Sequence, residues 1–116
     1  MIRTTFLTLA LACATVLFSG TAARADDPSI VASNWKFTPG TITVHVNQPT
    51  TLKLSSTEGV HGIQSDDLGI SNTTILPGKT VSITFTPKKT GTYLVHCTVF
   101  CGSGHQDMVL TIKVVN

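Results

Sequence analysis

Apolar and polar residues alternate along four segments of the chain, and this alternation predicts β-strands that each bury one face. The alternating segments are residues 41–46, 52–54, 81–85 and 110–114. Residues that favour turns separate them, at Pro39-Gly40, Asn47-Gln48-Pro49, Pro77-Gly78 and Pro87 with Gly91. Residues 26–116 contain no sustained helical period. We therefore predict an all-β domain of about seven or eight strands, folded as an antiparallel Greek-key sandwich.

The same alternation places a short loop between the last two strands. Residues 91–97 predict the next-to-last strand, in which Cys97 faces one side of the sheet and His96 the other. Residues 106–115 predict the last strand, with Met108 near its start. A loop fixed to a sheet at both ends holds its side chains more rigidly than a free segment does.

The first 25 residues are typical of a secretory signal. Arg3 precedes an apolar run over residues 6–18, and Ala23-Arg24-Ala25 has the small-x-small pattern of a cleavage site. A membrane anchor needs about 20 apolar residues, and this run is shorter and interrupted by polar residues. We expect residues 1–25 to be a signal peptide, residues 26–116 to form one domain, and the protein to be periplasmic or otherwise secreted. Anchoring by an uncleaved signal and lipidation at Cys13 are the less favoured alternatives, and we expect no stable membrane insertion.

The charge balance argues against nucleic acid as a partner, and the absence of catalytic motifs argues against two common kinds of enzyme. The whole chain has a formal net charge of +2, whereas lysines and acidic residues are equal in number in residues 26–116. Because no basic run is present, nucleic acid is not an expected partner. No Ser/His/Asp arrangement or phosphate-binding glycine loop is present either. We expect a monomer that is not itself an enzyme.

The loop before the last strand carries an unusual set of possible metal ligands. Cys97, Cys101, His105 and Met108 follow one another with the spacing C-x3-C-x3-H-x2-M. Two thiolates, an imidazole and a thioether suit copper better than other common metals. Gly102 and Gly104 lie within the loop and give the backbone the freedom to fold around a metal.

A further candidate ligand, His61, lies upstream in VHGIQS, just after a strand-like run. With His61 the donors number five, one thiolate more than the two histidines, one cysteine and weak axial methionine of a blue-copper site. Two copper ions that share two bridging thiolates, with one histidine on each ion and the methionine as a weak ligand, would use all five donors.

Two other interpretations of the cysteines stay open. In a small secreted chain, a cysteine pair is more often a disulfide than a metal site, although a disulfide would leave His105 and Met108 unexplained. A tetrahedral zinc site made of His61, Cys97, Cys101 and His105 is chemically sensible, but it would leave the methionine without a role.

Three other conspicuous side chains have simpler interpretations. His45 alternates with apolar neighbours and is expected to face solvent, and His96 is expected to face away from the cysteine beside it. Trp35 is expected to pack in the core or at its rim.

The chain from about residue 29 to residue 115 resembles the cupredoxin fold, and in particular the copper-A (CuA) domain of cytochrome c oxidase subunit II. The resemblance is carried by three motifs, which are EGVHGI around His61, LPGKTVSITFTPKKTGTY over residues 76–93, and CTVFCGSGHQDM over residues 97–108. The CuA domain of nitrous-oxide reductase is similar in the ligand loop.

The resemblance implies a role for each candidate ligand. Cys97 and Cys101 would bridge two copper ions, and His61 and His105 would each bind one. Met108 would be a weak ligand, and the backbone carbonyl of Val99 would be another.

The chain departs from the oxidase subunits in two respects. Many of them have an acidic side chain where this chain has Val99, and this acidic side chain contributes to a magnesium site. They also carry one or two transmembrane helices ahead of the domain. The resemblance therefore favours a free-standing periplasmic electron carrier that exchanges single electrons with a redox protein such as cytochrome c or a haem-copper oxidase. The alternatives are a copper-delivery protein and a detached, subunit II-like component of an oxidase.

Overall fold

The computed structural model describes residues 12–16 and 27–116. Most of the predicted signal peptide therefore lies outside the described residues. The described part contains nine strands and one short 3-10 helix. They are β1 (Ser29–Ser33), β2 (Lys36–Thr38), β3 (Thr41–His45), β4 (Thr50–Ser56), β5 (His61–Ser65), β6 (Ile70–Ile75), β7 (Val81–Phe85), β8 (Gly91–His96), η1 (His105–Asp107) and β9 (Val109–Val115).

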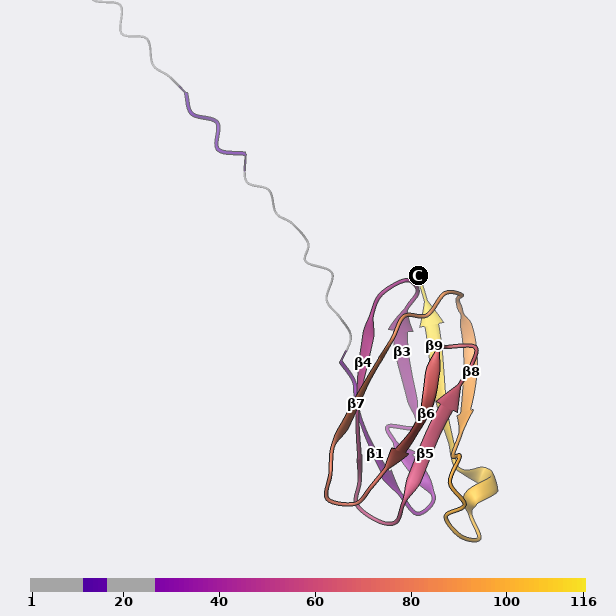
Figure 1. The fold of residues 1–116 in the computed structure, drawn as a ribbon. Coiled ribbons are helices and arrows are strands. Elements are labelled where there is room, and N and C mark those ends of the chain that lie inside the picture. The colour runs from indigo at the N-terminus through magenta and orange to yellow at the C-terminus, as the bar shows by residue number, and fades with distance from the viewer. Residues whose placement is uncertain (1–11, 17–26) are drawn as a thin grey trace, which may run out of the picture.

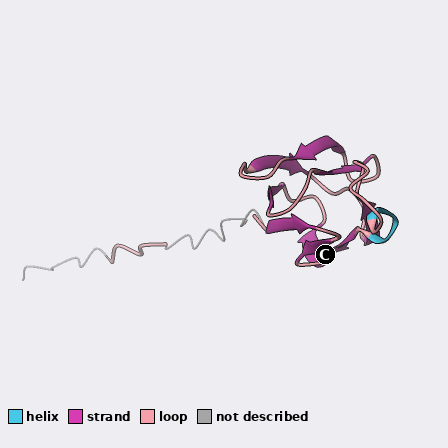
Figure 2. Cartoon of the chain, turned by 90° about the horizontal axis from the view of Figure 1, so that it is seen from below, coloured by secondary structure: helices cyan, strands magenta, loops and turns pink. Residues whose placement is uncertain are grey.

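The strands form two facing sheets and a hairpin (Figure 1). One sheet has the order β2-β1-β4-β7 and the other has the order β3-β9-β8. The β5-β6 hairpin lies between β7 and β8 and closes one side of the sandwich. Seen along the strands, the sheets and the hairpin surround a common interior (Figure 2). The predicted all-β fold is confirmed.

The expectation that the strands of the sandwich are antiparallel is wrong for two strand pairs, which are parallel. Strand β1 runs parallel to β4, and β3 runs parallel to β9. The chain changes sheets between β2 and β3, so β1 and β3 lie in different sheets and each pairs with a later strand. Alternation along a strand shows which side chains are buried but carries no information about the direction of the neighbouring strand.

Burial follows the alternation that the sequence shows. In β3 and β9, buried residues alternate with more exposed ones, and β4 buries every second residue. The buried apolar side chains of both sheets and the hairpin form one core. Its members are Ile30, Ala32, Phe37, Ile42, Val44, Leu52, Leu54, Ile63, Leu68, Ile70, Ile75, Phe85, Val95, Cys97, Met108, Leu110, Ile112 and Val114.

The last strand begins later than the sequence predicts. It starts at Val109 rather than at residue 106, because η1 occupies His105–Asp107. The amide of Met108 donates to the carbonyl of His105, which closes this helical turn. Met108 therefore lies directly before the strand and is completely buried.

The predicted ligand segments meet at one end of the sandwich. At this end β5 begins with His61 and β8 ends at His96, and the loop up to β9 extends past them (Figure 1). The amide of Thr98 donates to the carbonyl of Gly62 (3.1 Å), so the start of the loop is fixed to β5. The amide of Cys97 donates to the carbonyl of Met108 (3.1 Å), so the two ends of the loop are fixed to each other.

Among the described residues, no helix is both long and apolar enough to cross a membrane.

Candidate metal centre

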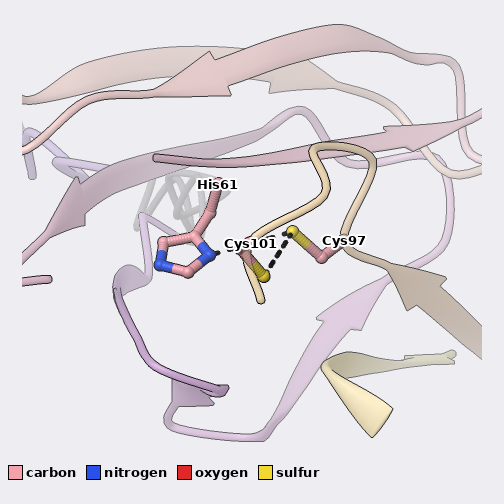
Figure 3. A group of neighbouring side chains, drawn as sticks. All are labelled: His61, Cys97 and Cys101. Carbon is pink, nitrogen blue, oxygen red and sulfur yellow. Dashed lines mark hydrogen bonds between the residues drawn. The ribbon is translucent and has the colours of Figure 1, made fainter. Parts of the chain in front are cut away.

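Three of the predicted ligands form a compact group at the loop end of the sandwich (Figure 3). One donor atom from each of His61, Cys97 and Cys101 lies within 4.8 Å of the other two. The Nδ1 atom of His61 is 3.8 Å from the sulfur of Cys97, and the two sulfurs are 4.0 Å apart. These distances are short enough for one metal ion to contact several of the atoms.

The remaining candidate ligands lie around the same two sulfurs. The Nδ1 atom of His105 is 3.6 Å from the sulfur of Cys101, and the sulfur of Met108 is 3.8 Å from it. The carbonyl oxygen of Val99 is 3.3 Å from the sulfur of Cys97. The structure thus brings together all six residues that the sequence selected, and each thiol has its own imidazole neighbour.

The environment of His61 fixes which ring nitrogen faces the sulfurs. The side chain is completely buried at the start of β5, and its Nε2 atom is 2.6 Å from the carbonyl oxygen of Glu58. Because a carbonyl oxygen can only accept, Nε2 must carry the proton and donate it. In the neutral form of the ring the lone pair is then on Nδ1, which faces Cys97 and can bind a metal.

Trp35 has a role at the loop that its position in the sequence did not reveal. Its indole Nε1–H donates to the carbonyl oxygen of Cys101 (2.8 Å), and its ring lies against Gly102 and Gly104. A Cβ at Gly104 would lie 2.5 Å from the indole ring, closer than real Cβ atoms approach other atoms. Gly102 has φ +118°, a backbone conformation that glycine adopts far more readily than other residues. The two loop glycines therefore allow close contact with Trp35, in addition to letting the chain turn.

A second contact fixes the beginning of the loop. The Oγ1–H of Thr98 donates to the side-chain oxygen of Asn72 on β6 (3.0 Å). A Cβ at the buried Gly62 would collide with Thr98 Oγ1 and come within 3.1 Å of the Thr73 carbonyl oxygen. A residue larger than glycine at position 62 would therefore push the loop away from β5.

The two sulfurs differ in their exposure. Cys97 is buried and Cys101 is half-buried. Burial raises the pKa of the Cys101 thiol above its ordinary value, and the neighbouring Cys97 raises it further. A cation that binds both sulfurs must displace their protons, and its positive charge would compensate the desolvation that disfavours the Cys101 thiolate.

The donor set can be tested against the two alternatives. Both cysteines are free thiols in this structure, with sulfurs 4.0 Å apart, whereas a disulfide bond is about 2.05 Å long. A four-ligand zinc site has no use for the thioether of Met108, which nevertheless lies buried beside Cys101. Soft thiolates and a thioether, together with two imidazoles, fit copper.

The other two histidines lie outside this group. His96 is exposed and faces away from the buried Cys97, as the alternation predicts. His45 is half-buried on β3 rather than facing solvent fully.

A β-sandwich that gathers soft sulfur and imidazole donors at one end defines the class of small copper-binding electron-transfer domains. The chain belongs to the family of cupredoxin-like domains, which it matches over residues 5–111.

The relatives of this chain include a subunit of cytochrome c oxidase. It is 32% identical to cytochrome c oxidase subunit 2 of Thermus thermophilus over 85 residues, which are 73% of this chain and 62% of that subunit. The chain therefore spans less than two thirds of this relative.

Two solved structures have a similar fold. The periplasmic domain of subunit II of cytochrome oxidase from Bradyrhizobium japonicum superposes with a TM-score of 0.71 at 19% identity, covering 80% of this chain and 86% of that domain. A chain of a heme-copper terminal oxidase dimer superposes with a TM-score of 0.68 at 26% identity, covering 78% of this chain and 65% of the other.

Proposed function

We propose that this domain holds a dinuclear CuA centre and transfers single electrons between redox proteins. Cys97 and Cys101 bridge two copper ions, and His61 and His105 each bind one of them. Met108 and the backbone carbonyl of Val99 complete the site as weak ligands. The observation that best supports this proposal is that each of the two thiols has its own imidazole, at 3.8 Å for Cys97 and at 3.6 Å for Cys101.

Copper supplies reversible one-electron chemistry, and the protein keeps the ligands in place while the charge changes. The ligand loop is fixed to β5 through Thr98, to β9 through Met108 and to the β1-β2 turn through Trp35. His61 and Met108 are completely buried, so water does not reach them. Such a site undergoes little rearrangement on oxidation or reduction, which favours fast electron transfer.

Two exposed aromatic side chains offer a contact surface for a redox partner. Phe100 is 79% exposed and Trp35 is 40% exposed, and both belong to the loop end of the sandwich. The Phe100 ring lies 5.4 Å from the His105 ring, measured between centroids. A partner that covers Phe100 would therefore approach a copper ligand closely. We propose a cytochrome c or a haem-copper oxidase as the partner, in the periplasm, after removal of residues 1–25.

The test is an anaerobic copper titration of the reduced domain that begins near Asp26, with metal counted per chain. We expect two copper ions, and a coloured product once the copper-loaded domain has been oxidised by one electron. One copper ion, one zinc ion held in preference to copper, or no metal would each contradict the proposal.

Copper delivery is the second candidate, because Cys101 and His105 are half-buried and can be reached from the surface. The two functions predict different behaviour towards a copper-free oxidase subunit II domain. Rapid transfer of copper to that domain would indicate delivery, whereas retention would support electron transfer. Co-purification with a haem-copper subunit would instead indicate a component of an oxidase.

A further inference from the structure

Ser56 is one of three buried polar residues in the described part of the chain, together with Thr50 and His61. It is the last residue of β4, and 6% of its surface is exposed. Its Oγ atom lies 2.7 Å from the carbonyl oxygen of Gly59 and 3.0 Å from that of Glu58. A hydroxyl group has one proton to donate, so Ser56 shares it between the two carbonyls of the turn that leads to β5.

The carbonyl of Glu58 connects Ser56 with the candidate metal ligand His61. This oxygen accepts the Nε2–H of His61 (2.6 Å) as well as the hydroxyl of Ser56. Because Glu58 contributes its backbone, a substitution of its side chain leaves this acceptor in place. A substitution of Ser56, in contrast, removes one of the hydrogen bonds that the carbonyl accepts.

The backbone of Ser56 is held in place on both sides, and the turn that leads from it to His61 is tight. Ser56 pairs with Ala32 of β1 and forms an isolated bridge with Pro77, so its backbone cannot shift easily. Gly59 has φ +74°, and a Cβ there would lie 3.3 Å from His61 Nε2. The turn therefore follows the edge of the imidazole closely. A small rotation of its peptide units would move the carbonyl oxygen that accepts the hydrogen bond from Nε2 of His61.

We propose that Ser56 is a positioning residue for the metal centre: its hydroxyl orients the Glu58 carbonyl, which holds the proton of His61 on Nε2 and leaves Nδ1 facing Cys97. This inference rests on the proposed function, in which His61 binds copper through Nδ1. Loss of a contact that orients a metal-binding histidine typically weakens metal binding about 10- to 100-fold. Ser56 acts one contact further away, so we expect an effect at the lower end, about 10-fold.

The experiment compares the unchanged domain with Ser56→Ala, with Ser56→Thr and with the control Ser55→Ala. Ser55 precedes Ser56, is half-buried and points to the opposite face of β4. Two quantities are measured. The first is the tautomer of His61 in the reduced, metal-free domain, from the nitrogen chemical shifts of its imidazole. The second is the affinity for Cu(I), from competition with a chromophoric chelator.

In the unchanged domain, in Ser56→Thr and in Ser55→Ala, we expect His61 to be protonated on Nε2 and copper to bind equally well. In Ser56→Ala we expect a mixture of tautomers and copper binding that is weaker by about 10-fold. If Ser56→Ala does not fold, the pair Ser56→Thr and Ser56→Val isolates the hydroxyl, because these side chains have nearly the same shape.

This inference would be overturned if Ser56→Ala, or Ser56→Val in its place, had the same His61 tautomer and the same Cu(I) affinity as the original domain. In that case the original domain would still bind two copper ions, so the proposed function would stand. Failure of the proposed function looks different. In that case the unchanged domain would not bind two copper ions, and the metal-free tautomer of His61 would still report on Ser56.

Discussion

Replacing Trp35 with phenylalanine should loosen the ligand loop without removing an aromatic ring from it. The indole Nε1–H is the donor to the Cys101 carbonyl at 2.8 Å, and phenylalanine has no such donor. The remaining ring can still cover part of the loop, although the smaller ring loses some of the contact with Gly102, where the nearest indole atoms are Cζ2, Nε1 and Cε2. The substitution therefore removes the hydrogen bond while it keeps an aromatic ring at this position.

The size of the effect follows from the exposure of the contact. A hydrogen bond contributes about 0.5–1.5 kcal/mol net, and water can reach this one, because 40% of the Trp35 surface is exposed. We expect the free energy of unfolding to fall by about 1 kcal/mol, which lowers Tm by about 4–8 °C in a domain of this size. If copper leaves through opening of the loop, the same energy speeds its release about five-fold.

The assays are thermal unfolding of the metal-free domain, followed by circular dichroism, and the rate of copper loss to excess chelator. Leu94→Ala is the matched control, because Leu94 is an exposed apolar residue on β8 (61% exposed) outside the loop. We expect Leu94→Ala to change neither quantity noticeably. Equal Tm values and equal copper-release rates in Trp35→Phe and the unchanged protein would refute the role assigned to the indole.

Three further predictions concern the loop and its ligands. Gly62→Ala introduces a Cβ that collides with Thr98 Oγ1, so we expect a lower Tm and weaker copper binding; wild-type values for both would show that the loop does not depend on this close contact. Met108→Leu nearly conserves the volume of a buried side chain, so we expect a stability loss below about 1.5 kcal/mol but a changed reduction potential by voltammetry, and an unchanged potential would argue against a thioether ligand. Phe100→Ser alters a residue that is 79% exposed, so we expect stability within about 0.5 kcal/mol of the original and slower electron exchange with a cytochrome c in stopped-flow experiments; unchanged exchange would place the contact surface elsewhere.

The sequence predicts those parts of the fold that depend on local alternation. Strands β3, β4, β7 and β9 are all recognisable, because in each of them every second side chain is buried or half-buried against the core. The parallel pairing of β1 with β4 is not recognisable, because the direction of a neighbouring strand depends on how the whole chain crosses between sheets. The 3-10 turn at His105–Asp107 is too short to produce a periodic pattern.

The candidate ligands are recognisable from the sequence because thiols, imidazoles and a thioether at short spacing are rare outside metal sites. The residues that support them are not recognisable. Trp35 lies 66 positions before the carbonyl that it binds. Ser56 donates its hydroxyl to the backbone carbonyl of Glu58, and a backbone acceptor has no signature in the sequence.

The electron paramagnetic resonance spectrum of the copper-loaded, oxidised domain tests the central claim most directly. If Cys97 and Cys101 bridge two copper ions, one unpaired electron is shared equally by two identical nuclei, and the copper hyperfine pattern has seven lines. A four-line pattern, which a single copper nucleus produces, would contradict the account.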